Sequence, residues 1–138
     1  NYLAWLGAKV GSLGTRRQRL AAAFKASKTY EDRLAKNLIS NLIAKEGITI
    51  HGITDAAQIA RRVPTISFTH DTIQPDAIAQ YLDEQGIFVW NGHNYALEVV
   101  RHLGISEDVG VLRIGLAHYN TEEEVNLLLS AIRGFLKA

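Results

Sequence analysis

An arginine stands in the middle of an apolar run, VLRIGL over residues 111–116, and this run constrains the fold more than any other part of the chain. Large apolar side chains occupy every second position, at Leu112, Ile114 and Leu116, which is the period of a β-strand with one face in a core. Arg113 therefore lies on the opposite face of that strand. A guanidinium keeps its charge in proteins, and burying it without a partner is costly. We expect an anionic group to meet Arg113.

Two interpretations of Arg113 follow from the residues alone. The anionic group is either a ligand or a carboxylate of the protein itself, with Glu98 and Asp83 as candidates. Structural ion pairs are common, so the residues do not decide between the two.

The composition limits the kinds of function that the chain can have. Its 138 residues fit one compact domain, and its net charge of +1 argues against nucleic-acid and anionic-membrane partners. No apolar run is long enough to cross a bilayer. There is no cysteine, which excludes disulfides and thiolate chemistry in these residues and favours a cytoplasmic location. The five histidines lack metal-site spacing, so we expect no metal.

The pattern of apolar residues predicts helices, two strands, and then alternating helices and strands. A short helix over residues 2–6 ends at Gly7, and a capping box at residues 15–18 begins a long helix with a bend or short break near residues 27–29. Strands are expected at 48–53, 65–69, 87–90 and 110–117, with helices beginning near residues 75, 95 and 121. This order predicts an α+β fold, in which helices cover a small, mostly antiparallel sheet.

Three further polar features have ordinary structural explanations. His93 in the turn GHNY suits a partly buried, hydrogen-bonded histidine, and Asn120 suits a turn or helix cap. Arg61 and Arg62 suit a solvated loop.

The chain contains no methionine and opens on an apolar segment, so we expect residues 1–14 to be the end of another domain and a link, and residues 15–138 to be a small domain.

Four segments, taken in order, resemble one family. They are YEDRLAKNLISNL, RRVPTISF, IFVWNGHNYA and VLRIGLAHYNTEEEV. Together they resemble the C-terminal small domain of the pyridoxal-phosphate enzymes of aminotransferase class V, the group that contains the cysteine desulfurases. The resemblance implies the small domain of the fold type I transferases, with a long N-terminal helix that joins it to a large domain.

The resemblance also implies roles for four residues. Arg113 matches the arginine that binds the α-carboxylate of the substrate, a task that suits a planar guanidinium. The segment GHNYA matches the active-site loop, with the pattern Gly-His-His-Cys-Ala, so His93, Asn94 and Tyr95 are expected at the substrate site. Tyr95 stands where the desulfurases have cysteine, and because a tyrosine cannot form a persulfide, this argues against desulfurase chemistry by the usual route.

The cofactor of the family is held by a lysine of the large domain. None of the six lysines here stands in such a context, so the resemblance implies no catalytic and no cofactor-binding residue in this chain. Pyridoxal phosphate, a large domain and an amino-acid substrate would belong to a longer, homodimeric protein, whose reaction could be transamination, elimination or racemisation. The alternative is a stand-alone α+β binding or interaction module without catalysis, in which Arg113 forms a structural ion pair.

Overall fold

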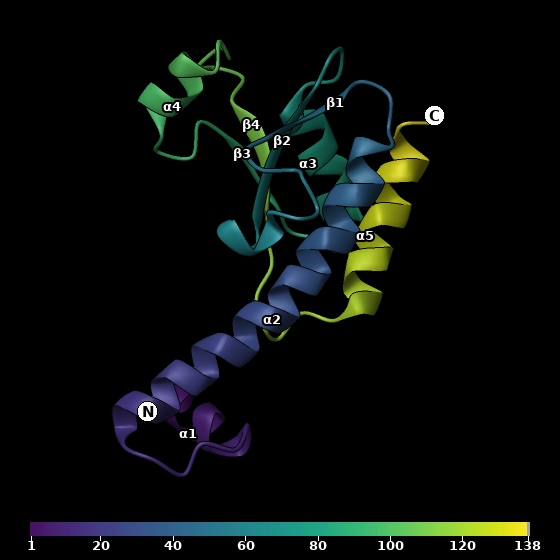
Figure 1. The fold of residues 1–138 in the computed structure, drawn as a ribbon. Coiled ribbons are helices and arrows are strands. Elements are labelled where there is room, and N and C mark those ends of the chain that lie inside the picture. Colours follow the sequence, from purple (N-terminus) through teal and green to yellow (C-terminus); the bar gives the residue numbers. More distant parts are fainter. Residues whose placement is uncertain (138) are drawn as a thin grey trace.

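A computed structural model describes residues 1–137, and it has the predicted α+β architecture (Figure 1). Helices and strands follow one another in the expected order. The elements are α1 (Tyr2–Lys9), α2 (Arg16–Ile43), β1 (Ile48–His51), the 3-10 turn η1 (Ile59–Arg61), β2 (Thr65–His70), α3 (Pro75–Glu84), β3 (Trp90–Gly92), α4 (Leu97–His102), β4 (Val111–Gly115) and α5 (Glu122–Phe135).

The four strands form one antiparallel sheet in the order β1-β2-β4-β3. Residues paired across neighbouring strands share a face of the sheet. Ile50, Phe68 and Leu112 are paired in this way and face the core. The residues of the adjacent row face the other way: His51 on β1, Ser67 on β2, Arg113 on β4 and Trp90 on β3.

Helices α2, α3 and α5 contribute to a single core with the apolar face of the sheet, and α4 lies apart from them (Figure 1). Phe68 and Leu112 are fully buried at its centre. The alternation in β4 is as predicted, since Leu112 and Ile114 are buried while Arg113 is only partly covered.

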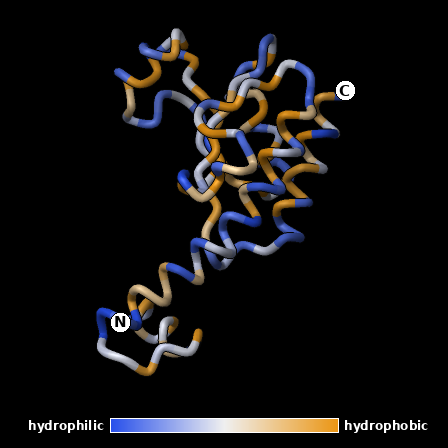
Figure 2. The backbone as a smooth tube through the Cα atoms, in the orientation of Figure 1, coloured by the Kyte–Doolittle hydropathy of each residue, from blue (hydrophilic) through white to orange (hydrophobic). Residues whose placement is uncertain are grey.

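Helices α2 and α5 run parallel, side by side, with their C-terminal ends on the same side of the molecule (Figure 1). Near the start of α5, the Tyr30 hydroxyl donates a 2.7 Å hydrogen bond to the carbonyl oxygen of Asn120. One turn further, Arg33 forms a 2.9 Å ion pair with Glu122. Hydrophobic and hydrophilic residues alternate along both helices, as expected for helices with one buried face (Figure 2).

Both predicted capping boxes are present. Thr15 and Gln18 exchange side-chain and backbone hydrogen bonds at the start of α2, and Thr121 and Glu124 do so at the start of α5. The hydrogen bond that the Thr121 backbone N–H donates to the Glu124 carboxylate is the main reason why the pKa of Glu124 lies below its usual value. Each box satisfies two backbone N–H groups that the helix itself leaves unpaired.

The predicted bend or short break near residues 27–29 is wrong, because α2 is continuous from Arg16 to Ile43 and runs straight in Figure 1. The Thr29 hydroxyl donates to the carbonyl oxygen of Lys25, four residues earlier, at 3.0 Å. Lys28 and Asp32 also form an ion pair at helical spacing. Thr29 therefore adds a bond within the helix where we expected it to begin a new one.

Helix α1 also differs from its prediction, since it continues through Gly7 to Lys9. Gly7 is buried where α1 crosses α2, and a Cβ atom there would lie 1.8 Å from the carbonyl oxygen of Arg19. The glycine therefore permits a close helix crossing and does not end the helix. The proposed domain boundary between residues 14 and 15 stays a prediction.

The third strand begins at Trp90, three residues later than predicted. The chain leaves α3 through Gly86, whose φ is +73°, and the Ile87 N–H donates to the carbonyl oxygen of Leu82 at 2.9 Å. This helix-ending motif keeps Ile87 beside α3. Pairing with β4 therefore starts only where Trp90 meets Arg113.

Candidate functional site

Arg113 opens on a cavity of about 410 Å³ on the face of the sheet opposite the core helices. Strands β1, β2 and β4 supply one side, the loop before α4 supplies another, and α4 itself closes the third. The lining residues are His51, Gly52, Ser67, His93, Asn94, Ala96, Val99, Val100, Leu103, Val111 and Arg113. A volume of this size suits a small organic ligand.

The Arg113 guanidinium lies beside an aromatic ring and makes no contact with a carboxylate of the described residues. Its central carbon lies 5.9 Å from the ring centroid of Trp90, the residue paired with it on β3. Within residues 1–137, Arg113 makes no ion pair, and the candidate partner Glu98 binds Arg101 instead. A cation–π contact orients the guanidinium without neutralising it. The planar group thus keeps its hydrogen-bond donors for another partner.

The predicted loop residues lie differently with respect to this cavity. His93 and Asn94 line it, whereas Tyr95 is 94% exposed and lies outside the lining set. The Asn94 side-chain amide donates to the carbonyl oxygen of Gly92 at 2.8 Å, and the Tyr95 N–H donates to Nδ1 of His93 at 3.1 Å. The structure therefore brings Arg113, His93 and Asn94 around one cavity and leaves Tyr95 at its outside.

The loop also holds two consecutive residues in left-handed backbone conformation. Asn94 has a φ of 52° and Tyr95 a φ of 60°, and they are the two non-glycine residues with positive φ within residues 1–137. Asparagine tolerates this conformation, but for tyrosine it carries an appreciable steric penalty. Such strain persists where the surrounding structure imposes it, and it often accompanies functional loops.

We expect Tyr95→Gly to stabilise the fold by about 0.5–1 kcal/mol. Relief of the left-handed conformation is worth about 1–2 kcal/mol, and the greater freedom of glycine in the unfolded chain offsets about half of that. Urea unfolding measures the change. The control is Tyr119→Gly, at an exposed tyrosine with negative φ, which should destabilise the fold. If Tyr95→Gly destabilises the fold as much as the control does, the backbone of Tyr95 is not strained.

Sequence reasoning missed His51 and Ser67, which line the same cavity. Nε2 of His51 lies 3.1 Å from the Thr69 hydroxyl, and burial lowers the pKa of the imidazole. The alternation of both strands was visible in the sequence. Their register was not, and only the pairing of His51 with Ser67 and of Ser67 with Arg113 places the three side chains in one row.

Two other polar predictions have different outcomes. Asn120 has the expected turn role, since its Oδ1 accepts from the Ala117 N–H at 2.9 Å, whereas Thr121 is the N-cap of α5. Arg62 is not a solvated loop residue: its guanidinium donates to the carbonyl oxygens of Ile53 and Thr65, and burial lowers its pKa. Through these two hydrogen bonds, Arg62 joins the segment after β1 to the start of β2.

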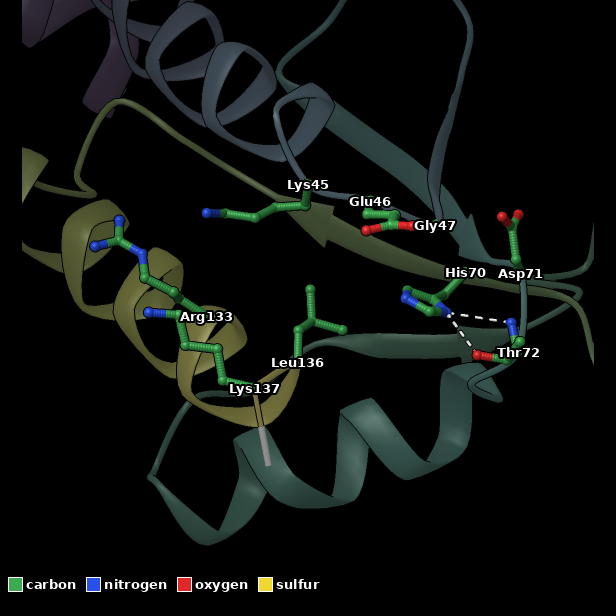
Figure 3. Close-up of a pocket in the computed structure, with 9 residues that line it drawn as sticks. All are labelled: Lys45, Glu46, Gly47, His70, Asp71, Thr72, Arg133, Leu136 and Lys137. Atoms are coloured by element: carbon green, nitrogen blue, oxygen red, sulfur yellow. Dashed lines mark hydrogen bonds between the residues drawn. The ribbon is translucent and has the colours of Figure 1, made fainter.

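A second cavity, of about 390 Å³, lies where the C-terminal ends of α2 and α5 meet β1 and β2 (Figure 3). Lys45, Arg133 and Lys137 line it, together with the acidic residues Glu46 and Asp71. The C-terminus of a helix carries a partial negative charge, and here two such ends lie together. The cations therefore have a structural explanation as partners of the helix ends, and the cavity needs no ligand to account for them.

Other kinds of site find no support in the described residues. Within residues 1–137, no cluster of three or more histidine, aspartate or glutamate side chains has the geometry to hold a metal ion. In the same range, no helix has both the length and the apolar character to cross a membrane.

Comparison with known proteins identifies the family. The model of the aminotransferase class-V family matches residues 10–128, so the chain belongs to this family. An aminotransferase-like protein, FGM3, of Gibberella zeae is 37% identical over 107 residues, which cover 75% of this chain and 26% of that protein. A probable cysteine desulfurase of Methanothermobacter thermautotrophicus is 39% identical over 64 residues, which cover 46% of this chain and 16% of that protein.

The fold matches solved structures of the same group. The apo structure of the cysteine desulfurase from Thermococcus onnurineus superimposes with a TM-score of 0.72 and 26% sequence identity. The match covers 87% of this chain and 30% of that one. The matches to FGM3 and to the Thermococcus onnurineus structure therefore span about a quarter to a third of the length of those proteins.

The family depends on pyridoxal phosphate, which provides a test of the site. An enzyme of this kind holds the cofactor through a lysine Schiff base. No lysine lines the cavity beside Arg113, and the lysines described are on α1, on α2 and at the ends of α2 and α5. The residues around this cavity therefore do not fit a Schiff-base site for the cofactor, and they are suited to binding and orienting a ligand.

Proposed function

We propose that this chain is the small domain of a larger pyridoxal-phosphate enzyme and that Arg113 binds the α-carboxylate of its amino-acid substrate. The observation that carries the proposal is the unpaired guanidinium beside a cavity of suitable size. Its planar pair of donors matches a carboxylate bidentately. Family membership supports the same role, because an aminotransferase acts on amino acids.

The other residues of the cavity would position the substrate and exclude water. His93 and Asn94 present polar groups from the loop, and α4 presents apolar side chains opposite the sheet. Trp90 would keep the Arg113 guanidinium in one orientation. Tyr95 would border the substrate only after the loop moves, since its ring now faces solvent. Persulfide formation at this position needs a cysteine, so the reaction would be another transformation of an amino acid.

The remaining parts of the proposal concern the protein around this chain. Residues 1–14 would connect to a large domain that supplies the cofactor lysine, and the enzyme would be a cytoplasmic homodimer. Within residues 1–137, Tyr2 and Trp5 on α1 are more than half exposed, which suits a surface that another domain covers.

Cofactor binding by the 138-residue chain tests this division of roles. Pyridoxal phosphate is mixed with the chain and then removed by dialysis, and the absorbance of the protein-bound cofactor is measured. We expect none to be retained, because the described cavity beside Arg113 lacks a lysine. Retention of one cofactor per chain would show that these residues form a cofactor site and would overturn the proposal that another domain supplies it.

A further inference from the structure

We infer that the cavity beside Arg113 selects amino acids with an apolar side chain and disfavours those with a second carboxylate. Val99 on α4 and Leu103 directly after it would contact the apolar side chain, and Ser67 and His51 would form the neutral polar side of the subsite. This inference rests on the proposed function of Arg113, since it assigns the substrate class of the same site.

The apolar wall is the first argument. Val99 is 58% exposed and Leu103 is 43% exposed, and both line the cavity from α4 and the residue that follows it. Exposed aliphatic side chains at the edge of a ligand cavity gain free energy when an apolar group covers them. A branched aliphatic side chain would bury this surface together with its own.

The charges that line the cavity are the second argument. Arg113 is the one lysine or arginine among its described lining residues, and those residues include no aspartate or glutamate. One carboxylate of a ligand is therefore matched. A second carboxylate would lose water without gaining a lysine or arginine partner, which is unfavourable in a largely apolar site.

The row across the sheet is the third argument. Ser67 lies on the strand next to that of Arg113, and His51 lies on the strand beyond it. Because neighbouring strands are about 4.8 Å apart, the backbone of His51 is about 10 Å from that of Arg113. Burial lowers the pKa of His51, which favours the uncharged imidazole. The side of the cavity away from Arg113 therefore offers hydrogen bonds without a compensating positive charge.

Binding of L-leucine and L-glutamate to the 138-residue chain tests the inference. The two ligands share the α-amino and α-carboxylate groups, so a difference in affinity reports on the side chain. Each ligand is titrated into the protein, and binding is monitored by NMR chemical shifts. We expect leucine to bind with a Kd of roughly 1–50 mM and glutamate to bind with about tenfold lower affinity. Val99→Asp should reduce leucine affinity by about tenfold, since it adds a charge to the apolar wall. The control, Leu127→Asp, changes an equally exposed residue of α5 and should leave leucine binding unchanged.

The outcomes separate this inference from the function on which it rests. If Arg113→Ala abolishes binding of both ligands but leucine and glutamate bind equally, or Val99→Asp has no effect, the substrate class is wrong while the role of Arg113 stands. If neither ligand binds in this range, the cavity of this chain does not form the subsite and the inference is contradicted, while the role of Arg113 is judged by the kinetics of the larger enzyme. If binding survives Arg113→Ala, the proposed function is itself contradicted.

Discussion

Arg113→Ala should lower kcat/KM by about 30- to 1,000-fold in the pyridoxal-phosphate enzyme that we propose contains this chain. Truncation removes a bidentate, charge-assisted contact worth about 2–4 kcal/mol, and each 1.4 kcal/mol corresponds to roughly a tenfold change in rate. The Trp90 ring would then cover an empty position, and no second arginine or lysine lines the described cavity to replace the lost one. Steady-state kinetics with saturating cofactor provide the measurement.

Two further variants show whether the loss comes from carboxylate recognition. Arg113→Lys keeps the charge but loses the planar pair of donors, so its kcat/KM should lie between those of wild type and Arg113→Ala. Arg133→Ala removes an arginine of α5 that borders the other cavity, and it should leave the kinetics unchanged. Equal activity of Arg113→Ala and wild type would refute the role of Arg113.

Phe68→Ala should destabilise the fold by about 3–5 kcal/mol, as large-to-small substitutions at fully buried aromatic residues do. Phe68 is paired with Ile50 on one side and Leu112 on the other, at the centre of the core face of the sheet. Its ring is fully buried, so truncation leaves a cavity that three strands and the covering helices cannot easily close.

Urea unfolding of the 138-residue chain measures this effect, and Phe88→Ala is the control. Phe88 is 82% exposed, so its truncation should change the free energy of unfolding by about 0.5 kcal/mol or less. A cost for Phe68→Ala as small as that of the control would mean that the sheet does not pack against the helices as described.

Local patterns in the sequence predicted the elements and failed at their ends. The alternation around Arg113 indicated the correct strand and the correct buried face, and both capping boxes marked true helix starts. The start of β3 was predicted too early because residues 87–89 are as apolar as a strand, whereas the backbone hydrogen bond from Ile87 to Leu82 holds them beside α3. Thr29 misled because its hydroxyl can either cap a new helix or bond back within one.

The candidate site depended more on tertiary structure than the fold did. The sequence identified Arg113 and two loop residues, His93 and Asn94, that the structure brings to one cavity. His51 and Ser67 join them only through strand register, which connects positions far apart in the chain and leaves no local signal. The exposed position of Tyr95 depends on its backbone conformation, which the residue type does not suggest.

A structure of the larger enzyme with its amino-acid substrate bound would test the central claim most directly. Our account predicts that the α-carboxylate lies against the Arg113 guanidinium with two roughly parallel hydrogen bonds of about 2.7–2.9 Å, beside the Trp90 ring. The contradicting result is an Arg113 paired with a carboxylate of the protein, with the substrate carboxylate held by other residues.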